Sequence, residues 1–323
     1  MSTTTSFFIP VQEEIHQVEK LMQFQAEGHH ADLQAALRHI LASGGKRIRP
    51  TVTLLVGRMF GAPQDKLITL AAAIELLHTA TLVHDDLIDG ALLRRGIPTL
   101  NSQWSPGATV LTGDFLFARA AKLAADTNSI PVMSLFSKTL SIIVNGEISQ
   151  LFSSRCQADR EGYYQRIYAK TASLFETSAA CAALISPVSD EILQAVRSFG
   201  YNIGMAFQIA DDLLDYIGNP ARMGKPVGND LREGKFTLPL IIALRESTPA
   251  DRERLLQMIE APVKDGEIQQ VVEIIRRYDG FAQTQAIAAH HVRQAMEALG
   301  SLPPSTIRES LTALCDYIVE REV

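Results

Sequence analysis

Apolar residues recur three and four positions apart along most of the chain, which is the spacing of one helical face. The clearest run holds Leu67, Leu70, Ile74 and Leu77, and it ends at residues 82–89 (LVHDDLID). Similar helical patterns cover residues 11–41, 114–125, 131–152, 160–185, 190–217 and much of 238–323. We find no persuasive strand alternation or hairpin signal. The pattern therefore predicts an all-α protein.

Two of these predicted helices end in paired carboxylates. Asp85 and Asp89 are four residues apart and share one helical face, and Asp211 and Asp215 repeat the spacing just before residues 218–220 (GNP). The last turn of a helix already presents negative charge, so carboxylates there need a cation. Mg²⁺ suits such a place, because it takes one or two carboxylates and fills its shell with water and phosphate oxygens. A solvated helix end would explain one copy; two copies indicate carboxylates that await a phosphorylated ligand.

The composition agrees with a single helical domain spanning residues 1–323. The net charge of −6 gives no reason to expect nucleic acid or an anionic membrane as a partner. No low-complexity linker divides the chain, and neither a signal peptide nor an uncharged apolar run of membrane-spanning length is present. Cys156, Cys181 and Cys315 are few and far apart, which favours free thiols in a reducing compartment. We expect a cytoplasmic protein without a membrane span.

Basic residues flank the predicted carboxylate pairs in three places: residues 44–50 (GGKRIRP), Arg94 with Arg95, and the cationic loop 221–237. The glycines of the first segment let the backbone approach a ligand, and its three cations predict an anion clamp. The loop 221–237 is cationic enough to act as a lid over bound phosphate.

Seven short segments, taken in order, carry a resemblance to a known family. They are residues 44–50, 85–89 with 94–96 (RRG), 146–147 (GE), 170–171 (KT), 208–215 (QIADDLLD), 224–226 (GKP) and 234–235 (GK). In this order and spacing the chain resembles the trans-prenyltransferases, the polyprenyl diphosphate synthases.

The resemblance implies an isoprenoid-synthase helical bundle around a deep central cavity, usually a homodimer, that joins isopentenyl diphosphate head to tail to an allylic diphosphate. It implies about two to three Mg²⁺ ions, held by Asp85, Asp89, Asp211 and Asp215. Asp86 and Asp212 support these ligands, and Lys170 completes the catalytic set. The implied contacts to the allylic diphosphate are Arg94, Lys170, Thr171, Gln208, Lys225 and Lys235. Those to isopentenyl diphosphate are Lys46, Arg49, His78 and Arg95.

The expected product is long, as in octaprenyl and solanesyl synthases. Short-chain members of the family carry a bulky aromatic four or five residues before the first aspartate, where this chain has Thr81 and Ala80. The tail would therefore pass that depth, and Ala80→Phe is expected to shorten the product. Phe136, on the helical face of Glu147, is a candidate floor of the cavity, although ordinary core packing explains it equally well.

Other interpretations stay open at this point. A geranylgeranyl or farnesyl synthase of the same family, or a non-catalytic subunit of a heteromeric synthase, would share these motifs. Residues 13–16 and 75–78 both read Glu-x-x-His, the spacing of a di-iron carboxylate bundle. That alternative leaves the aspartate pairs and the basic loop unexplained.

Overall fold

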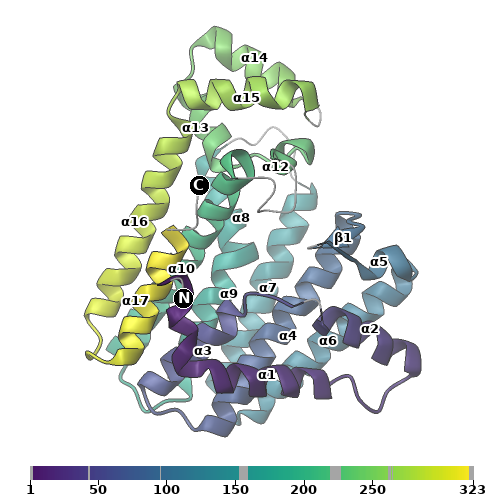
Figure 1. Ribbon diagram of the computed structural model, residues 1–323, viewed down its shortest axis with the longest axis vertical. Helices are drawn as coiled ribbons and strands as arrows, with labels where there is room; N and C mark the ends of the chain where they lie inside the picture. Colours follow the sequence, from purple (N-terminus) through teal and green to yellow (C-terminus); the bar gives the residue numbers. More distant parts are fainter. Residues whose placement is uncertain are drawn as a thin grey trace. The chain divides into compact units, whose positions relative to one another are not determined.

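The computed structural model describes residues 3–42, 44–94, 96–152, 159–218, 227–260, 263 and 265–319, and most of them lie in helices (Figure 1). The elements up to residue 152 are η1 (a 3₁₀ helix, Thr3–Val11), α1 (Gln12–Phe24), α2 (Ala31–Ala42), α3 (Ile48–Met59), α4 (Gln64–Ile88), β1 (Leu93–Arg94), β2 (Ile97–Pro98), α5 (Leu100–Gln103), α6 (Pro106–Asp126) and α7 (Ile130–Phe152). Those that follow are α8 (Arg160–Ile167), η2 (a π-helix, Tyr168–Ala172), α9 (Ser173–Leu184), α10 (Asp190–Ile217), α12 (Asn229–Arg232), α13 (Leu238–Glu246), α14 (Pro249–Ile259), α15 (Asp265–Arg277), α16 (Gly280–Gly300) and α17 (Thr306–Val319). The prediction of an all-α protein is confirmed.

Two local features differ from the pattern-based expectation. Helix α6 begins at Pro106 rather than near residue 114, because the Ser105 side chain accepts the Ala108 N–H at 3.3 Å and Pro106 occupies the first helical turn. Strands β1 and β2 form a short antiparallel hairpin, with Leu93 opposite Pro98. Gly96 makes its turn with a φ of 77°, which glycine adopts without steric cost.

The chain forms two compact units, each assembled from three separate stretches. Unit 1 comprises Met1–Thr139, Leu174–Arg197 and Leu299–Ala313; unit 2 comprises Leu140–Ser173, Ser198–Ala298 and Leu314–Val323. Because neither unit is one continuous stretch, they are not successive domains, and a single domain over residues 1–323 stays a prediction.

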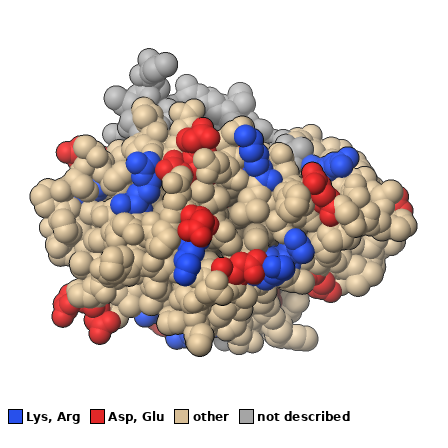
Figure 2. Space-filling view, turned by 90° about the horizontal axis from the view of Figure 1, so that it is seen from below, with Lys and Arg blue, Asp and Glu red and all other residues tan. Residues whose placement is uncertain are grey.

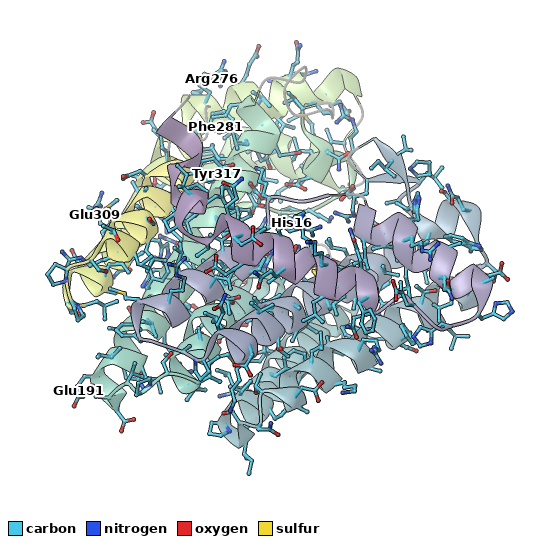
Figure 3. The ribbon with its side chains drawn as sticks, turned by 60° about the horizontal axis from the view of Figure 1, so that its bottom comes forward. His16, Glu191, Arg276, Phe281, Glu309 and Tyr317 are labelled. Carbon is cyan, nitrogen blue, oxygen red and sulfur yellow. The ribbon has the colours of Figure 1, made fainter. Side chains whose placement is uncertain are left out.

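Unit 1 is organised around α4. This helix packs mainly against α6 and also contacts α3 and α1. The approach to α6 is close at Gly113, where an added Cβ would lie 2.2 Å from His84 Nε2. By length and composition α4 could cross a membrane, but 67% of its apolar window is buried in the protein, as a core helix requires. Glu191 and Glu309 lie in the first turns of α10 and α17 and point into solvent (Figure 3), where their negative charge stabilises the helix N-termini.

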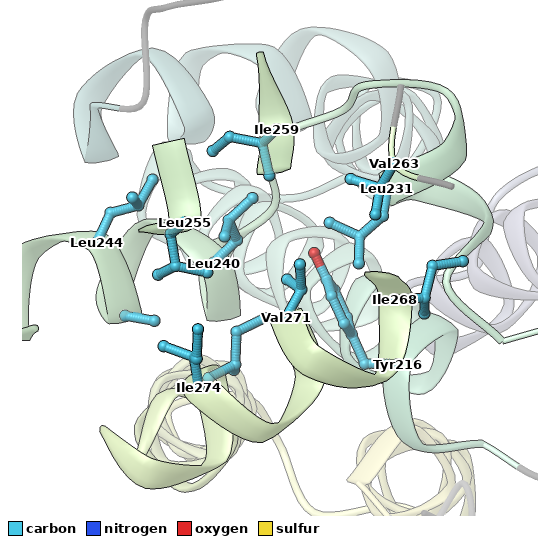
Figure 4. Packing of buried hydrophobic residues seen from close by; sticks show 12 residues of the cluster. Tyr216, Leu231, Leu240, Leu244, Leu255, Ile259, Val263, Ile268, Val271 and Ile274 are labelled. Carbon is cyan, nitrogen blue, oxygen red and sulfur yellow. The ribbon is translucent and has the colours of Figure 1, made fainter. Parts of the chain in front are cut away.

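Unit 2 contains two apolar clusters that position the end of α10. In the first, Tyr216 lies among Leu231, Leu240, Leu255 and Val271 (Figure 4), and the Tyr216 ring is 5.8 Å from that of Phe281. Helices α14 and α15 lie side by side over α13 (Figure 1). The second cluster packs α8 and α13 against the last turns of α10 through Tyr163, Ile167, Met205, Ile209, Leu238 and Ile241. The second aspartate motif therefore sits on a well-packed helix end.

Charged side chains of both signs are mixed on the one face that Figure 2 draws. On the face drawn in Figure 2, Lys and Arg alternate with Asp and Glu, and the described residues there form no large area of one sign.

Candidate active site

The first carboxylate pair lies at the end of α4, as its spacing predicts. The helix ends at Ile88, and Asp89 caps it by donating its N–H to the Asp85 carbonyl at 2.8 Å. Asp85 is half-buried and Asp89 is exposed, whereas Asp86 between them is buried. The flanking carboxylates are thus the ones that face solvent.

Asp86 is bound by Arg94 of the β1–β2 hairpin. Arg94 Nε donates to Asp86 Oδ1 at 2.8 Å and to Oδ2 at 3.0 Å, and Nη2 lies 2.7 Å from Oδ1. Burial lowers the pKa of Arg94, but the Asp86 hydrogen bonds and the charges of Asp86, Asp85 and Asp89 outweigh it and raise the pKa. Arg94 therefore stays charged beside all three aspartates. Arg95 lies outside the described residues.

The cationic side chains of the basic loop before α3 differ in their surroundings: Arg47 is paired with acidic residues, whereas Lys46 is exposed. Arg47, held at a φ of 47°, forms ion pairs with Glu19 at 3.0 Å and Glu75 at 2.9 Å, and its part in the three-cation clamp stays a prediction. Both acidic partners raise the pKa of Arg47 against the lowering effect of burial. Lys46 is exposed.

Arg49 and His78, both expected at the isopentenyl diphosphate, are brought together. Arg49 Nη1 lies 3.1 Å from His78 Nε2, and its guanidinium stacks 4.7 Å from the centre of the Phe175 ring. Because arginine only donates hydrogen bonds, His78 accepts through an unprotonated Nε2. Glu75 and His78 are thus committed to arginines, and the di-iron interpretation is wrong for residues 75–78.

The second aspartate motif has a buried centre. Asp212 is 6% exposed; Tyr163 Oη donates to its Oδ2 at 2.7 Å and Gln208 Nε2 to its Oδ1 at 2.7 Å. Thr171 Oγ1 in turn donates to Gln208 Oε1 at 2.7 Å. Burial raises the pKa of Asp212 to about 6, although both hydrogen bonds oppose this shift. Burial and the Asp212 charge raise the pKa of Tyr163 well above 10.0, so its hydroxyl remains a donor.

The other two carboxylates of this motif differ in exposure. Asp211 is half-buried, whereas Asp215 is 1% exposed and its Oδ2 accepts the Asp230 N–H at 2.9 Å. The Gly228 N–H also donates to the Asp215 carbonyl at 2.7 Å. An added Cβ at Gly228 would lie 2.8 Å from Ile268 Cγ2, so this close approach needs glycine. Residues 228–230 therefore enclose Asp215.

The predicted diphosphate contacts Lys170 and Thr171 both lie in the π-helix η2. A π-turn adds a residue to the helical repeat and is frequent at functional sites. Lys170 Nζ pairs with Glu147 Oε1 at 2.8 Å. Outside η2, a second predicted lysine, Lys235, pairs with Glu233 Oε2 at 2.5 Å. Lys225 lies outside the described residues.

The residues at both helix ends fit a hard divalent cation. Among the described residues, no three His, Cys, Asp or Glu side chains are placed to hold a metal ion by themselves. Each motif instead offers one pair of carboxylates, Asp85 with Asp89 and Asp211 with Asp215, without histidine or thiol. Such a set suits Mg²⁺ or Ca²⁺ when water and phosphate oxygens complete the shell.

The three residues predicted to set product length are unequal in exposure. Ala80 is 0% exposed and Phe136 is 2% exposed, so both are enclosed by protein. Thr81 is half-buried, and its hydroxyl donates to the His78 carbonyl at 2.7 Å. Of the two α4 positions, Ala80 and Thr81, only Thr81 has a side chain that is partly accessible to solvent.

Several partners of the predicted site residues carry little signal in the sequence. Tyr163 looks like an ordinary core aromatic of α8, and Glu147 stands out only as part of the Gly146-Glu147 motif. No spacing rule would have singled out Tyr163, because the π-helix that follows it at Tyr168–Ala172 breaks the α-helical repeat.

Comparison with known proteins gives a consistent result. The sequence model of the polyprenyl synthetase family matches residues 30–275. The chain is 36% identical to a prenyl transferase of Synechocystis over 326 residues, 99% of both chains, and 36% identical to the Escherichia coli octaprenyl diphosphate synthase over 289 residues, 88% of both. It also matches a crystal structure of a Caulobacter crescentus polyprenyl synthase complexed with calcium and isoprenyl diphosphate, with a TM-score of 0.93 and 36% identity over 99% of this chain and 98% of that one.

Proposed function

Since the chain belongs to the polyprenyl synthetase family and is a prenyltransferase, we propose that it is a Mg²⁺-dependent trans-polyprenyl diphosphate synthase. It joins isopentenyl diphosphate head to tail to an allylic diphosphate. The observation that carries the proposal is the repeated arrangement at the ends of α4 and α10: in each, an aspartate with protein donors lies between two further carboxylates four residues apart, of which Asp85, Asp89 and Asp211 are at least partly exposed.

In this proposal Asp85, Asp89, Asp211 and Asp215 hold about two to three Mg²⁺ ions. Bound there, Mg²⁺ supplies positive charge that neutralises the diphosphate as its bond to carbon breaks. Hard oxygen ligands without nitrogen or sulfur support this choice. The calcium and isoprenyl diphosphate bound to the Caulobacter synthase are consistent with it.

The cationic and polar side chains near the motifs bind the two diphosphates. Arg94, Lys170, Thr171, Gln208, Lys225 and Lys235 contact the allylic diphosphate in this scheme. Lys46, Arg49, His78 and Arg95 contact isopentenyl diphosphate. The exposed Lys46 and the neighbouring Arg49–His78 pair support the second assignment.

The reaction needs no nucleophile from the protein. The allylic C–O bond breaks and diphosphate departs, and the double bond of isopentenyl diphosphate forms the new C–C bond. The adduct then loses a proton to the departed diphosphate, which restores a double bond in the trans product. The protein holds both diphosphates in register and keeps water away from the allylic cation.

A long-chain product is the favoured outcome. The small residues Ala80 and Thr81 replace the aromatics of short-chain synthases, and an octaprenyl diphosphate synthase is among the similar proteins. A geranylgeranyl or farnesyl synthase is the alternative within the family.

We further propose a cytoplasmic homodimer. Exposed apolar side chains on α6 (Val110 and Leu111) and on α7 (Val144, Ile148 and Leu151) support a protein partner. The alternative is a heteromeric synthase in which this chain is one subunit. Activity of the chain alone distinguishes the two.

The direct test incubates the purified chain with Mg²⁺, isopentenyl diphosphate and farnesyl diphosphate, and sizes the dephosphorylated products. Products well beyond geranylgeranyl are expected. Products that stop at geranylgeranyl would retain the chemistry and refute the long-chain assignment. No elongation from any allylic primer would refute the proposed activity of the chain alone.

A further inference from the structure

Asp212 is the buried centre of the second motif, and the hydrogen bonds to both of its oxygens come from neutral side chains. We infer that Tyr163 is a positioning residue: its hydroxyl holds Asp212 so that the flanking Asp211 and Asp215 keep the arrangement that binds the cation. The inference rests on the proposed function, because it assigns these carboxylates to a divalent cation.

The Tyr163 ring is held so that its hydroxyl has little freedom. Tyr163 is 1% exposed and packs in the cluster with Ile167, Met205 and Ile209. The guanidinium of Arg166 lies 5.5 Å from the ring centre, and Arg166 Nη2 donates to the Phe236 carbonyl at 2.5 Å. Because the ring is held in place, its hydroxyl can donate to Asp212 from one direction only.

The hydrogen bond from Tyr163 is the first link of a chain that reaches a predicted substrate contact. Asp212 orients the Gln208 amide through Nε2, and the same amide accepts the Thr171 hydroxyl through Oε1. This series of hydrogen bonds thus connects α8, α10 and η2 within unit 2. It also fixes which end of the Gln208 amide is the donor.

Loss of the hydroxyl would leave a buried carboxylate oxygen without its donor. Such a group rotates toward another partner, since leaving it unsatisfied is costly. That rotation moves the acceptor offered to Gln208 and the carboxylate next to Asp211. Hydrogen-bond partners behind metal ligands have this kind of effect, and their substitution costs about 10-fold to 100-fold in metal affinity or activity.

The chain offers a matched control in the next residue. Tyr164 lies on the same helix, but its hydroxyl accepts from Arg160 Nε and Nη2 at 3.0 and 2.9 Å, on an exposed contact away from Asp212. Tyr163→Phe and Tyr164→Phe remove the same atom from adjacent positions. Only the first should change cation binding.

The test measures Mn²⁺ binding to the full chain in the presence of inorganic diphosphate, by paramagnetic resonance of free Mn²⁺. Tyr163→Phe should raise the Kd for Mn²⁺ about 10-fold or more, and Tyr164→Phe should leave it within about 2-fold. The Mg²⁺ concentration for half-maximal turnover should rise in parallel. If Tyr163→Phe lowers only the melting temperature and binds Mn²⁺ like the wild type, Tyr163 is a core residue and the inference is wrong.

A double-mutant cycle with Asp212→Asn tests the route of the effect. If Tyr163 acts through Asp212, Tyr163→Phe should change Mn²⁺ affinity by less than about 2-fold in the Asp212→Asn background. An undiminished loss there would overturn the inference. Elongation by the wild type is measured alongside: its absence would refute the proposed function, whereas an active wild type with an unaltered Tyr163→Phe variant would refute only the role of Tyr163.

Discussion

Arg47 provides the sharpest test of how the basic loop is used. Although it lies next to Lys46 and two residues before Arg49, the structure commits it to Glu19 and Glu75. Arg47→Ala should therefore damage stability more than substrate binding. Lys46→Ala, at an exposed neighbour, should do the reverse.

The magnitude follows from the burial of the partners. The side chains of Arg47 and Glu75 are 12% and 6% exposed, so removal of the arginine leaves a buried carboxylate uncompensated, at a cost of about 3–5 kcal/mol. The Glu19 side chain is 36% exposed, and its pair adds only about 0.2–1 kcal/mol. At about 2 °C per kcal/mol for a chain of this size, the melting temperature should fall by about 6–10 °C. Lys46→Ala should stay within about 0.5 kcal/mol of the wild type.

Urea and thermal unfolding followed by circular dichroism give both quantities. Glu75→Gln added to Arg47→Ala should recover at least half of the loss, because the uncompensated charge is then gone. A loss below about 1 kcal/mol for Arg47→Ala, similar to that for Lys46→Ala, would show that the Glu75 pair does not anchor the loop.

Three further predictions concern the site. Asp85→Ala should lower kcat by about 100-fold or more with unchanged circular dichroism, and wild-type turnover would refute the metal assignment. Ala80→Phe and Thr81→Phe should both shorten the product, but only Ala80→Phe, at an enclosed position, should also cost about 1–3 kcal/mol by overpacking; sizing products and melting both variants checks this. Burial raises the pKa of folded Asp212 from 3.8 to about 6, so its contribution to stability is fully present below pH 3.8 and is lost as the pH rises toward 6. In metal-free buffer the unfolding free energy of the wild type relative to Asp212→Asn should therefore fall between pH 4 and 7, and a flat difference would contradict the shift.

The long helices with a regular apolar pattern could be predicted from the sequence. The pattern over residues 190–217 coincides with α10, and that over 131–152 differs from α7 by one residue. Such segments repeat the same apolar face many times, so chance matches are rare. The β1–β2 hairpin has two residues in each strand, too few to show alternation, and only Gly96 marks its turn.

The carboxylate pairs could be predicted for a related reason, because a spacing of four residues at the end of a helix is a local property of the sequence. Their partners were not. Glu75 and Arg47 are 28 residues apart, and Tyr163 and Asp212 are 49 apart. Contacts at such separations depend on how helices pack, which periodicity does not report. For this reason the ion pairs of Arg47 and the contact made by Tyr163 could not be predicted from the sequence.

The two motifs solve one problem with different chemistry. In each, the aspartate between the two proposed metal ligands is buried and has protein donors. Asp86 is satisfied by the charged Arg94, so that pair is neutral as a whole. Asp212 is satisfied by the hydroxyl of Tyr163 and the amide of Gln208, so an ionised Asp212 keeps its charge beside Asp211. Asp212 therefore has no charged hydrogen-bond partner, and the positive charge that favours its ionised form comes from Arg166. Together with this charge, the hydrogen bonds from Tyr163 and Gln208 favour the ionised form of Asp212 and oppose the effect of its burial on the pKa.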